Sequence, residues 1–303
     1  MKVLVTGATS MIGVALSKEL LKKNQVVAVV RKKSSKTARL PQSPNLQIVE
    51  CEMQDYNHIA AGISGKVDVA VSLAWKGTRG ESRNDIVLQE SNYRYNIQLL
   101  EQLRKLGCRK IITAGSQAEY GLWYRKEKLD ESVVPNPNTE YGKYKLKFYE
   151  DAKMYCEENK IKLIESRFFS LYGPNDFEGT LVISMLKKML ANQPCNLTEC
   201  KQLWDFLYID DAIDGLVKLI ENHCEAGIYN FGSGESKSLK YYVEKMYQVA
   251  GSHSQLNYGV VPYPVTGMVN VNPSVEKLKG IGWKSQTFFE DGLRQIIGEL
   301  RDD

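Results

Sequence analysis

The sequence predicts an α/β fold built on a doubly wound parallel sheet. Short apolar and β-branched runs alternate with segments of helical periodicity through the first half of the chain. The runs are apolar at consecutive positions, which is typical of strands that are buried on both faces. Parallel neighbours need a crossover connection, and each intervening helical segment supplies one. We therefore expect one parallel sheet with helices on both of its faces.

The expected elements alternate regularly from the N-terminus onward. A strand over residues 2–6 leads through a glycine turn into a helix over 12–22 and a second strand over 25–30, which is a β-α-β unit. Further strands are expected over 46–49, 67–73, 110–114 and 161–168, and long helices over 87–106 and 141–159.

The alternation becomes irregular after residue 174. Helices are expected over 181–191 and 209–221 and a strand over 227–231, followed by helical and irregular segments. Open α/β sheets bind ligands at the carboxyl ends of their strands, where a smaller lobe can cover them. We expect a dinucleotide-binding domain at 1–172 and 203–232 and a substrate-binding lobe at 173–202 and 233–303.

The composition excludes several classes of protein. The chain has 303 residues, 43% of them hydrophobic and 25% charged, and its 40 Lys and Arg against 36 Asp and Glu give a net charge of +4. These values are typical of a globular protein without a nucleic-acid-binding face. No apolar run reaches the roughly 18 residues of a membrane span, and the strand pattern begins without a secretion signal. Six cysteines without a C-x-x-C motif and three scattered histidines predict free thiols, no metal site and a cytoplasmic location.

The turn after the first strand is typical of a Rossmann-type dinucleotide site. Gly7 permits the tight turn, and Gly13 lets the helix pack closely on the strand. Ser10 stands where a third glycine is common. The free N–H groups of the helix N-terminus favour a pyrophosphate. The residues expected to contact it are Gly7, Thr9, Ser10, Met11, Ile12 and Gly13.

The end of the second expected strand favours NADP over NAD. An acid about 20 positions after the glycines would hold the ribose 2′-hydroxyl of NAD. Here Arg31 and Lys32 open a basic run instead. A guanidinium can stack on adenine and bind a 2′-phosphate, so we expect NADPH, with NAD less favoured.

Ser116, Tyr141 and Lys145 are the candidate catalytic residues. Tyrosine and lysine four positions apart lie on one face of a helix, where an ammonium would lower the pKa of the phenol toward neutrality. Ser116 follows the fifth strand and can hydrogen-bond a substrate carbonyl as charge develops on its oxygen. The three predict general acid/base chemistry on a carbonyl or hydroxyl group.

With these motifs the chain resembles the extended short-chain dehydrogenase/reductases, the NAD(P)-dependent nucleotide-sugar epimerase/dehydratase family, over essentially its whole length. The resemblance implies a nucleotide-diphosphate sugar substrate and a homodimer joined through the long helices. It also implies cofactor contacts by Glu52, Met53, Leu73, Ala74, Trp75, Asn92 and Phe168, beside those of Tyr141 and Lys145. Further matching segments are Arg167-Phe168-Phe169-Ser170-Leu171-Tyr172-Gly173-Pro174, Trp204-Asp205-Phe206-Leu207-Tyr208-Ile209-Asp210-Asp211 and Tyr229-Asn230-Phe231-Gly232-Ser233-Gly234-Glu235.

Departures from the family pattern favour a reductase. Dehydratases of the family carry T-D-E or T-S-E where this chain has Ser116-Gln117-Ala118, and neither Gln117 nor Ala118 can exchange protons near neutral pH. The string from Gly115 to Gly121 is similar to that of reductases acting on 4-keto-6-deoxy nucleotide sugars. The leading hypothesis is hydride transfer from NADPH to the 4-keto carbon, with Tyr141 as proton donor. A 4-epimerase that retains NAD and a non-catalytic NADP sensor are the alternatives, although the intact Ser, Tyr and Lys argue against the sensor.

Overall fold

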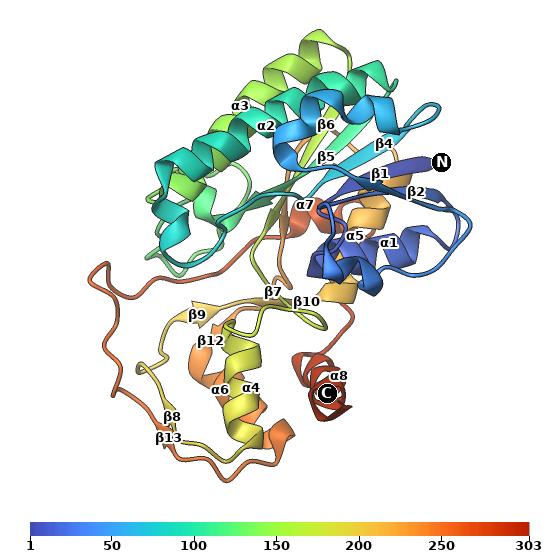
Figure 1. Ribbon diagram of the computed structural model, residues 1–303. Coiled ribbons are helices and arrows are strands. Elements are labelled where there is room, and N and C mark those ends of the chain that lie inside the picture. The colour runs from blue at the N-terminus through green and yellow to red at the C-terminus, as the bar shows by residue number, and fades with distance from the viewer. Residues whose placement is uncertain (303) are drawn as a thin grey trace. The chain divides into compact units, whose positions relative to one another are not determined.

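The computed structural model describes residues 1–302 and confirms the doubly wound sheet (Figure 1). Seven strands are ordered β11-β6-β5-β4-β1-β2-β3, and the pairings from β6 to β3 are parallel. The order reverses beside β1, so the carboxyl ends of β1 and β4 flank the crevice where such sheets bind ligands. The strands are β1 (Lys2–Thr6), β2 (Gln25–Val30), β3 (Leu46–Glu50), β4 (Val69–Ser72), β5 (Lys110–Ser116), β6 (Lys162–Phe168) and β11 (Gly227–Phe231).

Helices cover both faces of the sheet, as the apolar strands require. The helices are α1 (Met11–Leu20), α2 (Ile86–Lys105), α3 (Glu140–Glu158) and α5 (Ile209–Glu221), joined by the 3-10 segments η1 (Ser35–Arg39), η2 (Met53–Gly62), η3 (Gly80–Asn84) and η4 (Gln117–Glu119). Helices α2 and α3 pack side by side on the face opposite α1 (Figure 1). The four 3-10 segments were not among the expected elements, because such short pieces lack a clear hydrophobic period.

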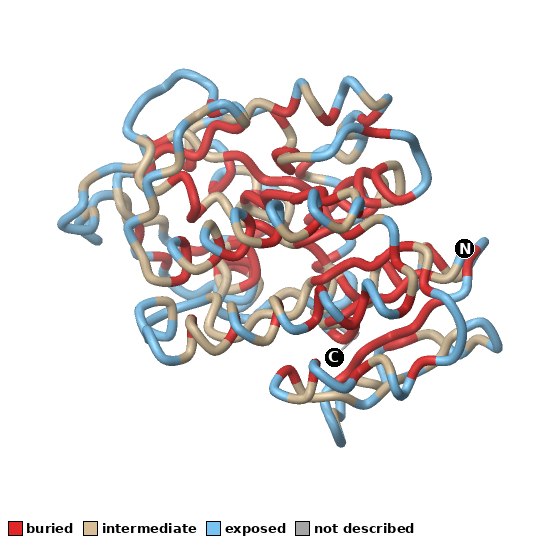
Figure 2. The backbone as a smooth tube through the Cα atoms, turned by 90° about the horizontal axis from the view of Figure 1, so that it is seen from above, coloured by how far each residue is buried: buried red, intermediate tan, exposed pale blue. Residues whose placement is uncertain are grey.

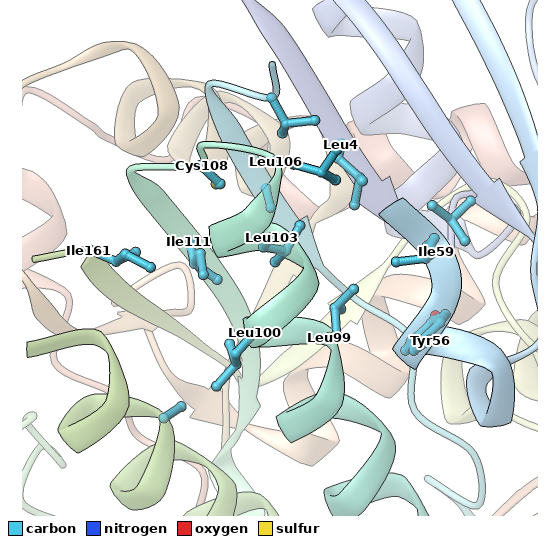
Figure 3. Packing of buried hydrophobic residues seen from close by; sticks show 14 of the residues in the cluster. Leu4, Tyr56, Ile59, Leu99, Leu100, Leu103, Leu106, Cys108, Ile111 and Ile161 are labelled. Carbon is cyan, nitrogen blue, oxygen red and sulfur yellow. The ribbon is translucent and has the colours of Figure 1, made fainter. Parts of the chain in front are cut away.

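The core of the sheet lies beneath α2, α3 and η2. Leu99 and Leu103 are one helical turn apart on α2 and reach Leu4 and Ile111 on the strands, and each of these side chains is at most 1% exposed (Figure 3). Burial of a leucine or isoleucine contributes about 1.5–3 kcal/mol. Figure 2 shows the same distribution, with buried segments gathered inside and exposed segments mainly on the outer loops. This packing holds the strand ends that carry the site.

The chain divides into two compact units. One comprises Met1–Gly121, Ser132–Phe168 and Ile213–Tyr229, and the other Leu122–Glu131, Phe169–Ala212 and the chain from Asn230 onward. The second unit thus takes residues 122–131, 169–172, 203–212 and 230–232, which the expected boundaries gave to the dinucleotide-binding domain. The functional assignment of the two parts stays a prediction.

The second unit packs around an aromatic cluster. Tyr172, Phe206, Tyr242 and Phe289 have ring centroids 4.8–6.1 Å apart in neighbouring pairs. Buried Asp211 accepts hydrogen bonds from Ser285, Gln286 and Thr287 and so holds the chain before the last helix. Its elements are β7 (Ser170–Tyr172), α4 (Leu181–Leu190), β8 (Cys195–Asn196), β9 (Leu203–Trp204), β10 (Phe206–Tyr208), β12 (Lys237–Ser238), α6 (Leu239–Ala250), β13 (Leu256–Asn257), α7 (Glu276–Lys279) and α8 (Phe289–Asp302).

Within residues 1–302, no helix combines the length and apolarity that crossing a bilayer requires. All six cysteines are free thiols, and five of them are buried.

Candidate active site

The first turn has the geometry that its glycines predict. Gly7 has φ +63°, and a Cβ there would lie 3.1 Å from the Ala74 nitrogen. A Cβ on Gly13 would lie 2.4 Å from the Gly7 carbonyl oxygen, so only glycine allows α1 to approach β1 this closely. Ser10 caps α1, because its Oγ accepts a hydrogen bond from the Gly13 N–H at 3.1 Å.

A cavity of about 370 Å³ opens beside this turn. Its volume lies within the range of small-molecule sites. Arg31 and Lys36 bring two cations to it, and the residues that line it are Gly7, Thr9, Ser10, Val29, Val30, Arg31, Lys36, Cys51, Met53, Tyr56, Leu73, Ala74, Trp75, Lys76 and Gly77. Eight of these were expected cofactor contacts. The lining does not include the other expected contacts Met11, Ile12, Gly13, Lys32, Glu52, Asn92, Tyr141, Lys145 and Phe168.

The two basic residues after β2 have different surroundings. Arg31 lines the cavity, whereas the Lys32 Nζ lies 3.2 Å from Asp55 and its backbone N–H donates to Glu52. Lys32 is therefore directed toward its acidic neighbours. Lys36 was missed as a site residue, although it belongs to the same basic run in the sequence.

Polar side chains hold the segment after β4 against the cavity. The Thr6 Oγ1 accepts hydrogen bonds from the backbone N–H groups of Leu73 and Ala74. Asn92, 1% exposed, bonds both the N–H and the carbonyl of Lys76. Asn92 thus acts on the site by positioning this segment. Sequence reasoning did not single out Thr6, whose hydroxyl gains its role only through the tertiary contact.

The three candidate catalytic residues are brought together by η4 and α3. Thr139 caps α3 and places Tyr141 in its first turn. A Cβ on Gly142 would lie 2.4 Å from the Ala118 carbonyl oxygen, so this glycine lets α3 start against η4. Ser116, the last residue of β5, thereby lies near the Tyr141 phenol and lowers its pKa.

The electrostatics of Tyr141 differ from the expectation. The pKa of its phenol is raised to about 12, because burial and the charge of Glu119 raise it by more than Ser116 and the charges of Arg83 and Arg79 lower it. The expectation that Lys145 draws this pKa toward neutrality is wrong for the surroundings seen here. Desolvation outweighs the nearby charges.

Lys145 has other contacts. Its Nζ donates to the Ala114 carbonyl at 2.6 Å and lies 4.0 Å from the centroid of the Trp75 ring. Burial lowers the pKa of the Lys145 ammonium to about 8, against the opposing effect of Glu119 and Glu165. The ammonium is therefore largely charged at neutral pH and loses its proton at mildly alkaline pH.

A buried ionic cluster lies directly under Ser116. The Ser116 N–H donates to the Glu119 Oε1 at 2.7 Å, and the Ser116 Oγ accepts from the Ala118 N–H. The Arg167 Nε lies 2.9 Å from both Glu119 and Glu165, and all three ionic side chains are at most 1% exposed. Burial and the neighbouring Glu119 raise the pKa of Glu165 well above its usual range. Sequence reasoning missed both acids, although Ser116 and Glu119 have the spacing of a capping box.

The model of the NAD dependent epimerase/dehydratase family matches residues 3–232, which include the first turn, Ser116, Tyr141 and Lys145. The chain belongs to the NAD dependent epimerase/dehydratase family. The resemblance that the motifs indicated is thus confirmed.

Two relatives of this family member extend over nearly its whole length. CDP-abequose synthase of Salmonella muenchen is 27% identical over 303 residues, covering 98% of this chain and 97% of the relative. An uncharacterized UDP-glucose epimerase, YtcB, of Bacillus subtilis (strain 168) is 26% identical over 321 residues, covering 99% and 98%.

Solved structures share the fold of this family member. A UDP-glucose 4-epimerase of Thermotoga maritima, solved with UDP-glucose, has a TM-score of 0.88 at 20% identity and covers 100% of this chain and 99% of its own. The UDP-glucose 4-epimerase of Thermus thermophilus, a complex with NAD, has a TM-score of 0.87 at 22% identity and covers 99% of each chain. At these identities the likeness establishes the fold.

Proposed function

We propose that this protein is an NADPH-dependent reductase of the 4-keto group of a nucleotide-diphosphate 6-deoxy sugar. The observation that carries the proposal is the buried Tyr141 phenol, whose pKa is raised to about 12, chiefly by burial. The phenol therefore holds its proton at neutral pH. Reduction of a carbonyl needs a proton donor at that position, and a protonated phenol provides one.

The residues around Tyr141 fit this role. The Ser116 Oγ accepts the Ala118 N–H, so its own hydrogen remains for donation to Tyr141 or to a substrate carbonyl oxygen. Lys145, four residues after Tyr141 on α3, would hold the ribose of the cofactor through its ammonium. When bound, the reduced nicotinamide would supply the hydride that the carbonyl carbon receives.

The cradle around Gly7 and Gly13 fits a dinucleotide. Both positions are too close to neighbouring backbone for a side chain, and the N-terminus of α1 lies at the turn. Arg31 and Lys36 supply two cations at the cavity, which favours the 2′-phosphate of NADPH over the free ribose hydroxyl of NAD.

Replacement of Arg31 tests the cofactor preference. One charge-assisted contact contributes roughly 1.5–3 kcal/mol, so Arg31→Ala should lower the kcat/KM for NADPH about tenfold to a hundredfold while leaving that for NADH nearly unchanged. Lys22→Ala, on an exposed residue paired with Glu19, is the matched control. Equal kcat/KM for the two cofactors in the wild type would contradict the preference.

The substrate class draws on two kinds of support. The names of the relatives, CDP-abequose synthase and UDP-glucose epimerase, refer to sugars carried on nucleoside diphosphates. Gln117 and Ala118 leave no acid and base for dehydration, and the next acid, Glu119, is fully buried against Arg167. Reduction needs neither of those positions.

A 4-epimerase is the second candidate, because some relatives carry that name: a putative UDP-glucose 4-epimerase of Methanocaldococcus jannaschii is 24% identical over 312 residues. An epimerase returns the hydride to the substrate and would keep its cofactor through purification. A reductase consumes one NADPH per product.

The decisive experiment measures NADPH oxidation with GDP-, dTDP-, CDP- and UDP-linked 4-keto-6-deoxy sugars. With 4-deuterated NADPH of the correct face, the reductase should place deuterium at C4 alone, with one cofactor consumed per product. Epimerisation of a saturated nucleotide sugar without added cofactor would favour the second candidate. Formation of a 4-keto-6-deoxy product from that sugar would make the protein a dehydratase.

We also propose a homodimer joined through α2 and α3. Exposed apolar residues lie on both helices, including Val87 and Met154. Sedimentation equilibrium of the wild type and of Met154→Glu should give a dimer and a weakened dimer, and a monomeric wild type would contradict this arrangement.

A further inference from the structure

Arg83 lies near Tyr141, and cofactor binding does not explain its position. The Arg83 guanidinium carbon lies 5.1 Å from the centroid of the Tyr141 ring. The side chain is half-buried, and its Nε is buried without a hydrogen-bond partner. A cation at this distance over an aromatic ring is attracted by the ring face and more strongly by a negative charge on its oxygen.

The segment that carries Arg83 is held firmly in place. Gln89, fully buried on α2, donates to the carbonyl oxygens of Gly77 and Ser82 and accepts from the Trp75 indole N–H. Asn84, next to Arg83, accepts the backbone N–H of Glu140 at the start of α3. These bonds tie η3 to the same turn of α3 that carries Tyr141.

Lys145 does not fill the role of a cation beside the Tyr141 phenol. Its Nζ is directed to the Ala114 carbonyl and to the Trp75 ring. The groups that act on the Tyr141 phenol come from three other elements: Ser116 at the end of β5, Glu119 in η4, and Arg79 and Arg83 at η3. Of these, the two arginines are the cations.

We propose that Arg83 is a positioning residue for Tyr141, and that its guanidinium stabilises the phenolate left when the phenol gives up its proton. The inference rests on the proposed role of Tyr141 as proton donor. In that step the phenolic O–H bond breaks, the proton bonds to the substrate oxygen, and the electron pair stays on the phenolate oxygen. The phenolate later regains a proton from water. A fixed cation beside the ring lowers the cost of this charge in a buried site.

The test titrates residue 141 without any substrate. A fluorinated tyrosine that ionises near neutrality is introduced at position 141, and its phenol is followed by ¹⁹F NMR as the pH rises. An opposite charge within about 4–6 Å lowers a pKa by roughly 1–3, so Arg83→Met should raise the pKa at this position by at least about 1. Arg83→Lys should restore most of the effect. Arg109→Met, on an exposed residue at the amino end of β5, is the control and should leave the pKa unchanged.

A kinetic measurement separates positioning from substrate binding. Arg83→Met should lower kcat about tenfold, the effect of a pKa change of one, with little change in KM. An unchanged pKa at position 141 would overturn the proposal, as would a raised KM with unchanged kcat, which marks a substrate ligand. If the pKa responds but no 4-keto sugar nucleotide is reduced, the proposed function fails and the action of Arg83 on Tyr141 stands.

Discussion

The ionic cluster under Ser116 allows a sharp test with two isosteric substitutions. The Arg167 Nε lies 2.9 Å from a carboxyl oxygen of Glu119 and 2.9 Å from one of Glu165, and all three side chains are at most 1% exposed. One cation therefore faces two carboxyl groups. The raised pKa of Glu165 means that this carboxyl tends to hold its proton, and Arg167 forms an ion pair with Glu119 through both Nε and Nη2. Glutamine has the shape and the donor of a protonated Glu165. It does not replace the charge of Glu119.

The two variants should therefore differ in stability. Removal of one partner of a buried ion pair costs about 3–5 kcal/mol. We therefore expect Glu119→Gln to lower the free energy of unfolding by that amount. At about 2–4 °C per kcal/mol for a unit of this size, the melting temperature should fall by roughly 6–20 °C. Glu165→Gln keeps an acceptor for the Arg167 Nε and should change the stability by less than about 1 kcal/mol.

The pH dependence gives a second measure of the same cluster. Folding raises the pKa of Glu165, so the native state holds a proton that the unfolded chain releases above about pH 4.3. The contribution of this group to stability is therefore greatest below that pH and falls as the pH rises toward the native pKa. Urea unfolding of wild type and Glu165→Gln between pH 5 and 8, followed by circular dichroism, should show a shallower decline in the variant. Equal losses in Glu119→Gln and Glu165→Gln at pH 7 would refute the reasoning.

Three further predictions concern the site and one the second unit. Tyr141→Phe should lower turnover by roughly 10²–10⁴ with little effect on cofactor affinity, and wild-type turnover on a confirmed substrate would exclude Tyr141 as the acid. In the wild type, cofactor affinity should weaken as the pH rises past about 8, where Lys145 loses its proton, and titration calorimetry of Lys145→Met should show weaker binding without this pH dependence. Gly13→Ala should impair folding or cofactor binding, because its Cβ would lie 2.4 Å from the Gly7 carbonyl oxygen; Gly298→Ala, with open space around it, is the control, and equal melting temperatures and cofactor affinities would contradict the close-packing argument. Asp211→Ala should destabilise the protein by about 1–3 kcal/mol, since three donors lose a buried acceptor, and an unchanged denaturation midpoint would show that water replaces it.

The sequence by itself determined the sheet, the first turn and the catalytic residue types. These depend on local rules: consecutive apolar residues for buried strands, glycine where the backbone approaches closely, and four-residue spacing on a helix. The first expected strands match β1 and β2, and Ser116, Tyr141 and Lys145 lie where β5 and α3 place them. The family assignment followed from the same motifs.

Only the tertiary structure decided how those residues are charged and held. Glu119 and Arg167 are 48 positions apart in the chain, yet they are in contact. Arg83 and Tyr141 are likewise neighbours in space, although the whole of α2 lies between them in the sequence. The spacing of Tyr141 and Lys145 predicted a lowered phenol pKa, yet burial raises it. A pKa depends on desolvation and on charges from distant segments, and neither is encoded in local spacing. The fold is therefore readable from short-range pattern, while the electrostatics of the site arises from contacts that form only when the chain is folded.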